Sequence, residues 1–420
     1  MLPNSPHHGL NERWPIWQPD ATDSDPAAPS FHVSPHRFGL WAEARREYPV
    51  AWTESATYGD FWSVTTHGFA REVLQNARHF SSASGMRLGA NERAVALASG
   101  KMLVVTDGAN HRRLRAAHTA WLSSSAIDRI RPGVEHDIEN LVAQLIAEGG
   151  SFDAVTGLGA IVARQVLARV LGIPQADWAE LGRLTDAAYA TNVAQDADEA
   201  HGQLLMYLYE LLEQRRVNPQ DDFVTALSQA AVDGRPLTDD EILLNCDGML
   251  TGGLETTPLA VSGALVAFAR DPASWQRLRG HPELLDAAVE EILRWTSPPA
   301  HVMRTATTDV SLGEARIRAG DRVVVWIPSA NRDEAVFPDG ERLKVDRDPN
   351  PHLSFGGGPH YCVGAVLARL ELRILLTVLT RLVSAIAETG REVRKQSNFL
   401  HGPEIAQVTV VPDPEAGYRK

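Results

Sequence analysis

The chain has 420 residues, 44% of them hydrophobic and 22% charged, and its formal net charge is -13. This acidic balance excludes nucleic-acid binding through bulk electrostatics and favours a small molecule or a locally matched protein as partner. With only two cysteines, Cys246 and Cys362, no disulfide framework is expected, and a reducing compartment such as the cytoplasm fits.

The first 30 residues are polar and rich in proline, without the basic start and apolar core of a secretory signal. We expect them to form a loosely ordered extension. A prior of ~150 residues per domain would divide the rest into two or three domains. However, no linker rich in proline, glycine or serine interrupts residues 31–420, so we expect one domain there. No uninterrupted apolar run of about 18 residues is found, so no membrane anchor is expected.

Apolar periodicity predicts a mainly α fold with a minor β portion. Short runs rich in β-branched and aromatic residues predict strands at Val50–Glu54, Phe61–Thr66, Arg322–Ile327 and Ala406–Val411. Apolar residues at helical spacing predict long helices at Ala126–Ile146, Gly157–Leu171 and Gly202–Gln214.

A basic helix is predicted at Asn110–Trp121, where the chain reads NHRRLR at the start. His111 and Arg115 are four residues apart and share one face of this helix. Arg112 and Arg113 point away from that face, and we expect them to be solvated because charge runs usually mark solvated surface.

A long helix is predicted over Asp239–Arg270, and Thr238 with Glu241 forms a capping box at its start. The motif TGGLETTP at residues 251–258 places two adjacent glycines and a proline inside this helix. Each glycine disfavours the helix by about 1 kcal/mol and the proline by about 3 kcal/mol. We therefore expect a distortion there, with a groove where the glycine side chains are missing.

The same motif carries an acid and a hydroxyl, Glu255 and Thr256. These two groups are the minimum needed to pass protons from solvent to a reacting oxygen. A kinked core helix with a solvated glutamate is the simpler interpretation of this stretch in isolation.

A further amphipathic helix, predicted over Pro282–Trp295, carries the motif EEILR. Glu291 and Arg294 are three residues apart and can form an ion pair. On an isolated helix such a solvated pair contributes little stability.

The last motif, FGGGPHYCVG at residues 355–364, delivers Cys362 to a helix predicted over Val363–Leu382. Helix-starting amides favour a thiolate, and the glycines permit the close approach of a flat cofactor. Two alternatives are open at this point. One is a buried structural cysteine, and the other is a zinc site of His352, His360 and Cys362, although no paired-cysteine spacing supports it.

Taken in order, these motifs resemble those of the cytochrome P450 family over most of the chain, from about Trp41 to the C-terminus. The family's haem signature, F-x-x-G-x-[HR]-x-C-x-G, is filled completely by Phe355, Gly358, His360, Cys362 and Gly364. The resemblance implies the single-domain cytochrome P450 fold and haem b as the cofactor. It also implies that Cys362 is the axial thiolate, which favours cleavage of the bound O–O bond.

The resemblance implies roles for other polar residues. Glu255 and Thr256 match the segment that serves oxygen activation. The cations that match propionate-binding positions are His111, Arg115, Arg304 and His360.

Two further sets follow from the resemblance. Glu291 and Arg294 match a structural pair that locks onto an arginine before the cysteine loop, and Arg342 occupies the matching place. The helix that carries Arg112 and Arg113 borders the surface where a ferredoxin docks in this family. These two arginines are therefore candidates for contact with an acidic redox partner.

Placing the family's pocket-forming segments on the chain predicts a mainly apolar substrate pocket. Its expected walls are Met86, Leu88, Val95, Leu250, Leu254, Val302, Met303, Phe399 and Leu400. His301 and His401 are candidate polar anchors, although a satisfied or solvated histidine is the simpler interpretation of each.

The prediction is a bacterial haem-thiolate monooxygenase that activates O₂ to hydroxylate or epoxidise a small organic substrate in secondary metabolism. Its electrons are expected from a ferredoxin and a ferredoxin reductase, and a monomer is expected. One alternative is oxidative coupling or ring formation without oxygen insertion. Another is a haem protein without turnover, against which Glu255 and Thr256 argue. The substrate is either free or tethered to a carrier protein.

Overall fold

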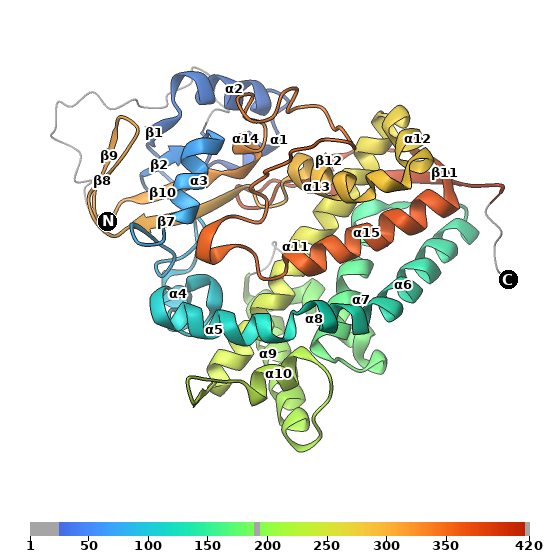
Figure 1. Cartoon of the computed structure of the whole chain (residues 1–420), viewed down its shortest axis with the longest axis horizontal. Coiled ribbons are helices and arrows are strands. Elements are labelled where there is room, and N and C mark those ends of the chain that lie inside the picture. Colours follow the sequence, from blue (N-terminus) through green and yellow to red (C-terminus); the bar gives the residue numbers. More distant parts are fainter. Residues whose placement is uncertain (1–24, 189–193, 416–420) are drawn as a thin grey trace. The chain divides into compact units, whose positions relative to one another are not determined.

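The structure is a computed structural model that describes residues 25–188 and 194–415. Its residues group into two compact units (Figure 1), each built from separate stretches of the chain. Among the described residues, unit 1 contains 25–99, 286–362 and 392–405, and unit 2 contains 100–188, 194–285, 363–391 and 406–415. Because neither unit is one continuous stretch, the units are not successive domains joined by a linker.

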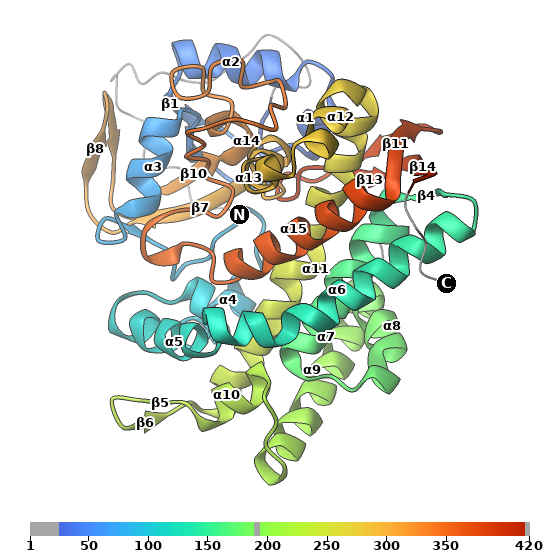
Figure 2. The same ribbon diagram turned by 45° about the vertical axis from the view of Figure 1, so that its right-hand side comes forward.

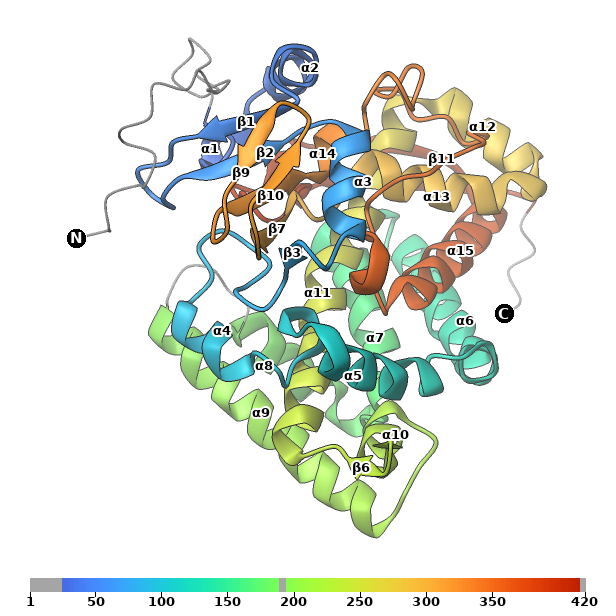
Figure 3. The same cartoon turned by 60° about the vertical axis from the view of Figure 1, so that its left-hand side comes forward.

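Unit 1 is organised around a five-stranded sheet with the order β1-β2-β10-β7-β3 (Figure 3). Strands β2 and β10 are parallel and the other neighbours are antiparallel. The strands are β1 (Val50–Thr53), β2 (Phe61–Val64), β3 (Phe80–Ser81), β7 (His301–Ala306) and β10 (Arg322–Trp326). The three strands predicted within this sheet are therefore confirmed to within two residues.

Both faces of this sheet are buried. Alternate residues of β10 belong to different apolar clusters, Val323 and Val325 to one and Val324 and Trp326 to the other. Helix α3 (His67–Gln75) contributes to the first cluster, whereas α1 (Pro29–Val33) and α2 (Arg37–Glu47) contribute to the second. Side chains on a strand alternate between its faces, so the run of valines is buried on both sides.

The ordered part of unit 1 begins earlier than predicted. Ala27 is fully buried in the second cluster and helix α1 starts at Pro29, so residues 25–30 belong to the fold and not to a loose extension. The rest of the predicted extension, residues 1–24, lies outside the described residues.

The remaining elements of unit 1 are short, apart from α13 (Leu285–Thr296), whose first residue belongs to unit 2. They are α4 (Glu92–Ala98), β8 (Val310–Leu312), β9 (Ala315–Ile317), α14 (Ile327–Ala330), η5 (Gly358–His360), β12 (Val393–Arg394) and β13 (Pro403–Ile405).

Unit 2 is mainly helical. Its longer helices are α5 (Gly108–Trp121), α6 (Ser124–Ala147), α7 (Ala160–Leu171), α8 (Trp178–Ala188), α9 (Ala194–Val217), α11 (Asp239–Arg270) and α15 (Ala365–Leu382). Shorter helical pieces are η1 (Leu103–Val105), the π-helical turn η2 (Ala154–Gly159), η3 (Gln175–Asp177), α10 (Phe223–Gln229), α12 (Pro272–Gly280) and η4 (Pro282–Leu284). Its strands are β4 (Ser151–Asp153), β5 (Ala231–Val232), β6 (Arg235–Pro236), β11 (Val383–Glu388) and β14 (Gln407–Pro412).

Helix α11 contacts α7, η2, α15 and β11 within unit 2, and α15 lies beside α6 (Figures 1 and 2). The predicted long helices and the C-terminal strand are confirmed, with α9 extending well beyond the predicted 202–214.

One stretch, Ala154–Leu171, is long and apolar enough to cross a membrane by length and composition alone, although polar residues such as Arg164 and Arg169 interrupt it. Just over half of it, 56%, is buried inside the protein. Since η2 and α7 pack against α11, the composition of this stretch is that of a core helix.

Candidate functional site

The cysteine loop folds back on itself at the end of unit 1. The amide of Cys362 donates to the carbonyl of Phe355 at 2.9 Å. Gly358 has a left-handed φ of 63°, and a Cβ there would lie 2.7 Å from the Cα of Gln75 on α3. Only glycine meets both requirements, so the loop needs this residue in order to pack on α3.

The two cysteines lie in opposite environments. Cys362 is exposed, whereas Cys246 is buried within α11 and its burial raises the pKa of the thiol well above the ordinary value. A buried structural cysteine therefore describes Cys246 and not Cys362. Reactive thiolates are accessible, while buried apolar surroundings keep a thiol protonated.

The zinc alternative finds no support in the structure. His352 contacts a carboxylate oxygen of Glu290 at 3.2 Å. Across residues 25–188 and 194–415, no group of three or more histidine, cysteine, aspartate or glutamate side chains could hold a metal ion. A single exposed cysteine beside a glycine-rich turn instead fits the axial position of a haem.

The helix after the cysteine begins slightly later than predicted. Helix α15 starts at Ala365 with Gly364 as its N-cap, two residues beyond the expected start at Val363. The amides of Leu367 and Ala368 both donate to the Gly364 carbonyl at 3.0 Å. The chain therefore passes from the cysteine to a regular helix within three residues.

Helix α11 begins at the predicted capping box. The amide of Thr238 donates to the Glu241 carboxylate at 2.9 Å, and the amide of Glu241 donates to the Thr238 hydroxyl at 3.3 Å. The α-helix then continues without a break through Pro258 to Arg270. The expected distortion does not interrupt the helix.

The two glycines of α11 have different roles. Gly252 has no atom within 4 Å of an added Cβ, so it leaves open space, whereas the groove was predicted at both glycines. A Cβ on Gly253 would lie 2.9 Å from Leu167 of α7, so this glycine permits helix packing. On the neighbouring side, a Cβ on Gly159 would lie 2.8 Å from the Cα of Pro258. The motif is thus held closely on one side and open on the other.

Glu255 and Thr256 are both partly exposed on α11. The Thr256 hydroxyl donates to the carbonyl of Gly252 at 2.6 Å. A hydroxyl has one proton to donate and two lone pairs. In this orientation the Thr256 oxygen is therefore available as an acceptor.

The Glu291–Arg294 pair on α13 is fully buried. The Arg294 guanidinium donates twice to the Glu291 carboxylate, at 2.7 and 2.8 Å, and both side chains are 0% exposed. The Arg347 guanidinium donates to the same carboxylate at 3.0 Å, and Asn350 donates at 3.1 Å. This is a shared buried network and not the solvated pair expected of an isolated helix.

Arg347, rather than the predicted Arg342, supplies the third charged group. The side chain of Arg342 is exposed, and Arg342 contributes its backbone carbonyl, which accepts from Arg294 at 3.1 Å. Both arginines lie in an irregular segment without periodicity, so sequence spacing could not separate them. The side chain of Arg347 is only 7% exposed.

Helix α5 confirms one predicted face and corrects another. His111 is buried and Arg115 is partly buried on the predicted face, and Arg112 is exposed as expected. Arg113 is not solvated. It is buried and forms an ion pair with Glu241, at the start of α11. The capping glutamate therefore also anchors α5.

The other two predicted propionate-binding cations belong to unit 1. Arg304 is buried on β7, and its guanidinium donates to the carbonyl of Met303 at 2.9 Å. His360 ends the short helix η5, two residues before Cys362. Arg304 and His360 lie in the same unit as Cys362, whereas His111 and Arg115 belong to unit 2.

Some predicted pocket residues lie together in unit 1. Val95 and Met303 both approach Gly85, at 3.6 and 3.8 Å from the position of an added Cβ. Val302 points to the opposite face of the sheet and packs against the first apolar cluster. Met303 and Leu88 belong to the second cluster. Val302 and Met303 therefore cannot line one pocket together, because adjacent strand residues face opposite sides.

Both candidate histidine anchors are structural. His301 accepts from the amide of Leu88 at 2.9 Å and contacts the carbonyl of Asn398 at 2.7 Å. Burial lowers the pKa of His301 to about 3. His401 contacts the carbonyl of Thr296 at 2.8 Å, and its burial lowers the pKa well below the usual value. The simpler interpretation of both histidines is correct.

The remaining predicted pocket residues lie on three segments. The backbone carbonyl of Met86 accepts from the amide of Met303 at 2.7 Å. Leu400 is buried and forms a β-bridge with Pro299. The ring of Phe399 contacts the guanidinium of Arg87 at 5.1 Å. On α11, Leu250 is fully buried and Leu254 is partly exposed.

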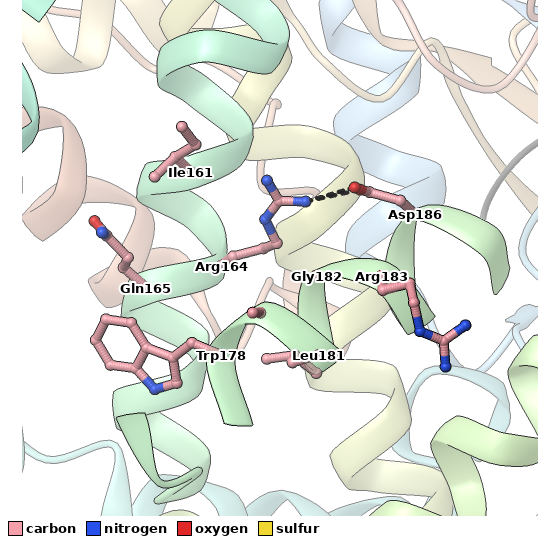
Figure 4. A pocket seen from close by; sticks show the side chains of 9 residues that line it. Ile161, Arg164, Gln165, Trp178, Leu181, Gly182, Arg183 and Asp186 are labelled. Atoms are coloured by element: carbon pink, nitrogen blue, oxygen red, sulfur yellow. Dashed lines mark hydrogen bonds and ion pairs between the residues drawn. The ribbon is translucent and has the colours of Figure 1, made fainter. Parts of the chain in front are cut away.

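An open cavity of about 330 Å³ lies between α7 and α8 (Figure 4). Trp178 and Gln165 line it, and Arg164 donates to Asp186 across it at 2.8 Å. None of the predicted site residues lines this cavity.

Comparisons with known proteins agree with this geometry. The family model described as Cytochrome P450 matches residues 175–409, more than half of the chain. The chain belongs to the cytochrome P450 family. Cytochrome P450 NovI of Streptomyces niveus is 35% identical to this P450. The alignment covers 90% of this chain and 94% of NovI. Linalool 8-monooxygenase of Pseudomonas putida is 34% identical to this P450, and the alignment covers 89% of this chain and 95% of the relative.

Solved structures lead to the same conclusion. The crystal structure of P450 OxyD, described as involved in the biosynthesis of vancomycin-type antibiotics, aligns with this P450 with a TM-score of 0.85. It is 33% identical and covers 92% of this chain and 99% of its own. The predicted P450 fold, the haem-thiolate cofactor and the monooxygenase class are therefore confirmed. A haem protein without turnover is not supported.

Proposed function

We propose that Cys362 is the haem ligand of this P450. The family needs a cysteine thiolate, and of the two cysteines only Cys362 is exposed and held in a glycine-rich loop before a helix. When bound, the haem supplies the binding and activation of O₂. We assign His111, Arg115, Arg304 and His360 to its propionates, with Phe355 and Gly364 in the loop that packs against it.

We propose that Glu255 and Thr256 deliver protons during O₂ activation. The support is their adjacent position on α11 beside the open space at Gly252. Because the Thr256 hydroxyl donates to the Gly252 carbonyl, its oxygen can accept a hydrogen bond and hold a donor there. Glu255 is partly exposed, so it can exchange protons with solvent.

Replacing Thr256 with alanine is expected to leave haem content and substrate binding unchanged. Reducing equivalents should instead be diverted to hydrogen peroxide or water, because the acceptor that holds the donor is lost. The measurement is product formed per NADPH consumed, together with peroxide released. Thr256→Ser keeps the hydroxyl and serves as the matched control, with coupling near that of the wild type. Equal coupling in the alanine and serine variants would show that this hydroxyl is not used.

We propose that the reaction is hydroxylation or epoxidation of a small organic compound in secondary metabolism, with electrons from a ferredoxin and its reductase. The support is the similarity to NovI, to linalool 8-monooxygenase and to OxyD, whose description names antibiotic biosynthesis. The substrate is free or bound to a carrier protein, and we place the enzyme in the cytoplasm as a monomer. Among the predicted pocket residues we propose Val95 and Met303, which both approach Gly85, as walls of the substrate pocket.

Oxidative coupling or ring formation is the second candidate, because the similar P450 OxyD is described as involved in the biosynthesis of vancomycin-type antibiotics. Turnover under ¹⁸O₂ separates the two. Label in the product supports hydroxylation or epoxidation, and an unlabelled product with a new bond supports coupling. Candidate substrates are found first by an optical titration, in which displacement of the distal water shifts the ferric haem from low to high spin.

A further inference from the structure

Helix α15 buries an acid that the sequence analysis did not single out. Glu371 is 3% exposed and lies among the apolar residues of α15. The side chain of Thr257 on α11 hydrogen bonds to its carboxyl group. The second carboxyl oxygen, Oε2, is buried and has no partner among the described residues. A buried polar atom of this kind calls for an explanation, because buried polar groups in native proteins are nearly always hydrogen-bonded.

Among the described residues, Glu371 forms no ion pair. The elements that contact α15 include α6, α7, α11, α12 and β11. Five arginines on these elements and on α15 itself pair with other carboxylates, as Arg169–Asp137, Arg381–Glu139, Arg279–Asp413, Arg270–Glu388 and Arg164–Asp186. Burial raises the pKa of Glu371 to about 8, and only the Thr257 hydrogen bond lowers it. The carboxyl group is therefore protonated and neutral at pH 7.

The partner of this acid adjoins the proposed proton relay. Thr257 is buried, whereas Thr256 is partly exposed. Adjacent residues on an α-helix are about 100° apart, so the two hydroxyls face different sides of α11. Thr257 is thus hydrogen-bonded to Glu371 of α15, and Pro258 packs closely on Gly159. These contacts fix the rotation of α11 where Glu255 and Thr256 are presented.

We propose that Glu371, as a neutral carboxylic acid bonded to Thr257, is a positioning residue that holds α11 in the orientation required for proton delivery. Its free Oε2 carries the acid proton, or shares it with an ordered water. Ionisation places an uncompensated charge in the core and disturbs the same contact. The inference rests on the proposed role of Glu255 and Thr256, although its stability test does not.

Linkage gives the first test, on the haem-loaded protein. The pKa of Glu371 in the folded state, about 8, lies above the ordinary carboxyl value of 4.5. The acid's contribution to stability is therefore full below about pH 4.5 and is lost as pH rises through about 8. Glu371→Gln cannot ionise. Relative to the wild type, its melting temperature should rise by several degrees between about pH 5 and about pH 9. A constant difference across this range would overturn the proposal.

A second variant moves the transition in a defined direction. Thr257→Val removes the hydrogen bond that lowers the pKa of Glu371, so the loss of stability should continue to a higher pH and be larger in total. The infrared band of a protonated carboxylic acid at neutral pH should be present in the wild type and absent from Glu371→Gln. Absence of the band from the wild type would contradict a neutral acid.

The amount of product formed per NADPH consumed distinguishes three roles of Glu371, which are positioning, proton donation and simple packing. Glu371→Gln keeps the shape and hydrogen bonding, so it should couple NADPH to product as the wild type does and lose the alkaline decline. Glu371→Leu fills the space without a polar group and should reduce coupling by roughly threefold or more, because small misplacements are costly. Wild-type coupling in the leucine variant would exclude positioning, and a loss in the glutamine variant would indicate that the acid donates its proton. Unchanged coupling in Thr256→Ala alone would remove the relay but leave the stability result intact.

Discussion

Replacing Cys362 with serine is expected to abolish the thiolate-type absorption of the reduced carbon monoxide complex. A serine hydroxyl has nearly the same shape, but it is not deprotonated and is a harder ligand, so it does not push electron density onto the iron. Haem content should fall or the spectrum should change to that of a different axial ligand. Monooxygenase turnover should be lost. The measurement is the reduced carbon monoxide difference spectrum of the purified variant, with haem quantified separately.

Cys246 provides a matched control within the same chain. It is buried on α11, and burial keeps its thiol protonated by raising the pKa. Cys246→Ser should therefore retain the thiolate-type spectrum, with at most a moderate loss of stability from the buried hydroxyl. A retained spectrum in Cys362→Ser, or a lost one in Cys246→Ser with normal haem content, would reverse the assignment.

Features that depend on neighbouring residues could be predicted from the sequence. The capping box of α11 forms because Thr238 and Glu241 are three residues apart, and both of its hydrogen bonds are present. The buried valine run of β10 could be identified as a strand because its residues are β-branched. The turn of the cysteine loop is equally local, since Gly358 has a left-handed φ of 63°, although the packing of this glycine against Gln75 on α3 is not.

Features that depend on tertiary burial could not be predicted in this way. Arg342 and Arg347 lie in one irregular segment, where no periodicity indicates which side chain turns inward. Arg113 was expected in solvent because its neighbours are basic, but Glu241 lies more than a hundred residues away in sequence and pairs with it. Val302 and Met303 are different, because the alternation of a strand would have placed them on opposite faces.

Replacing Glu291 with glutamine is expected to destabilise the protein by about 3–5 kcal/mol, since it leaves two buried guanidinium groups without a charge partner. The wild-type carboxylate accepts from Arg294, Arg347, Asn350 and the amide of Lys344, the last at 2.8 Å. A glutamine amide cannot accept at both positions. The measurement is the free energy of unfolding in denaturant, with haem retention followed in parallel. A loss below about 1 kcal/mol would contradict a buried network.

The two arginines of the irregular segment give a sharper comparison. Arg347→Ala removes a guanidinium that contacts Glu291 at 3.0 Å, and it should cost about 1.5–3 kcal/mol, the range for a hydrogen bond to a charged group. Arg342→Ala removes an exposed side chain while keeping the backbone carbonyl that Arg294 uses, so it should stay within about 0.5 kcal/mol of the wild type. The double variant should resemble Arg347→Ala alone. If Arg342→Ala were the more damaging change, the side chain of Arg342 would have to be the third charged group in solution.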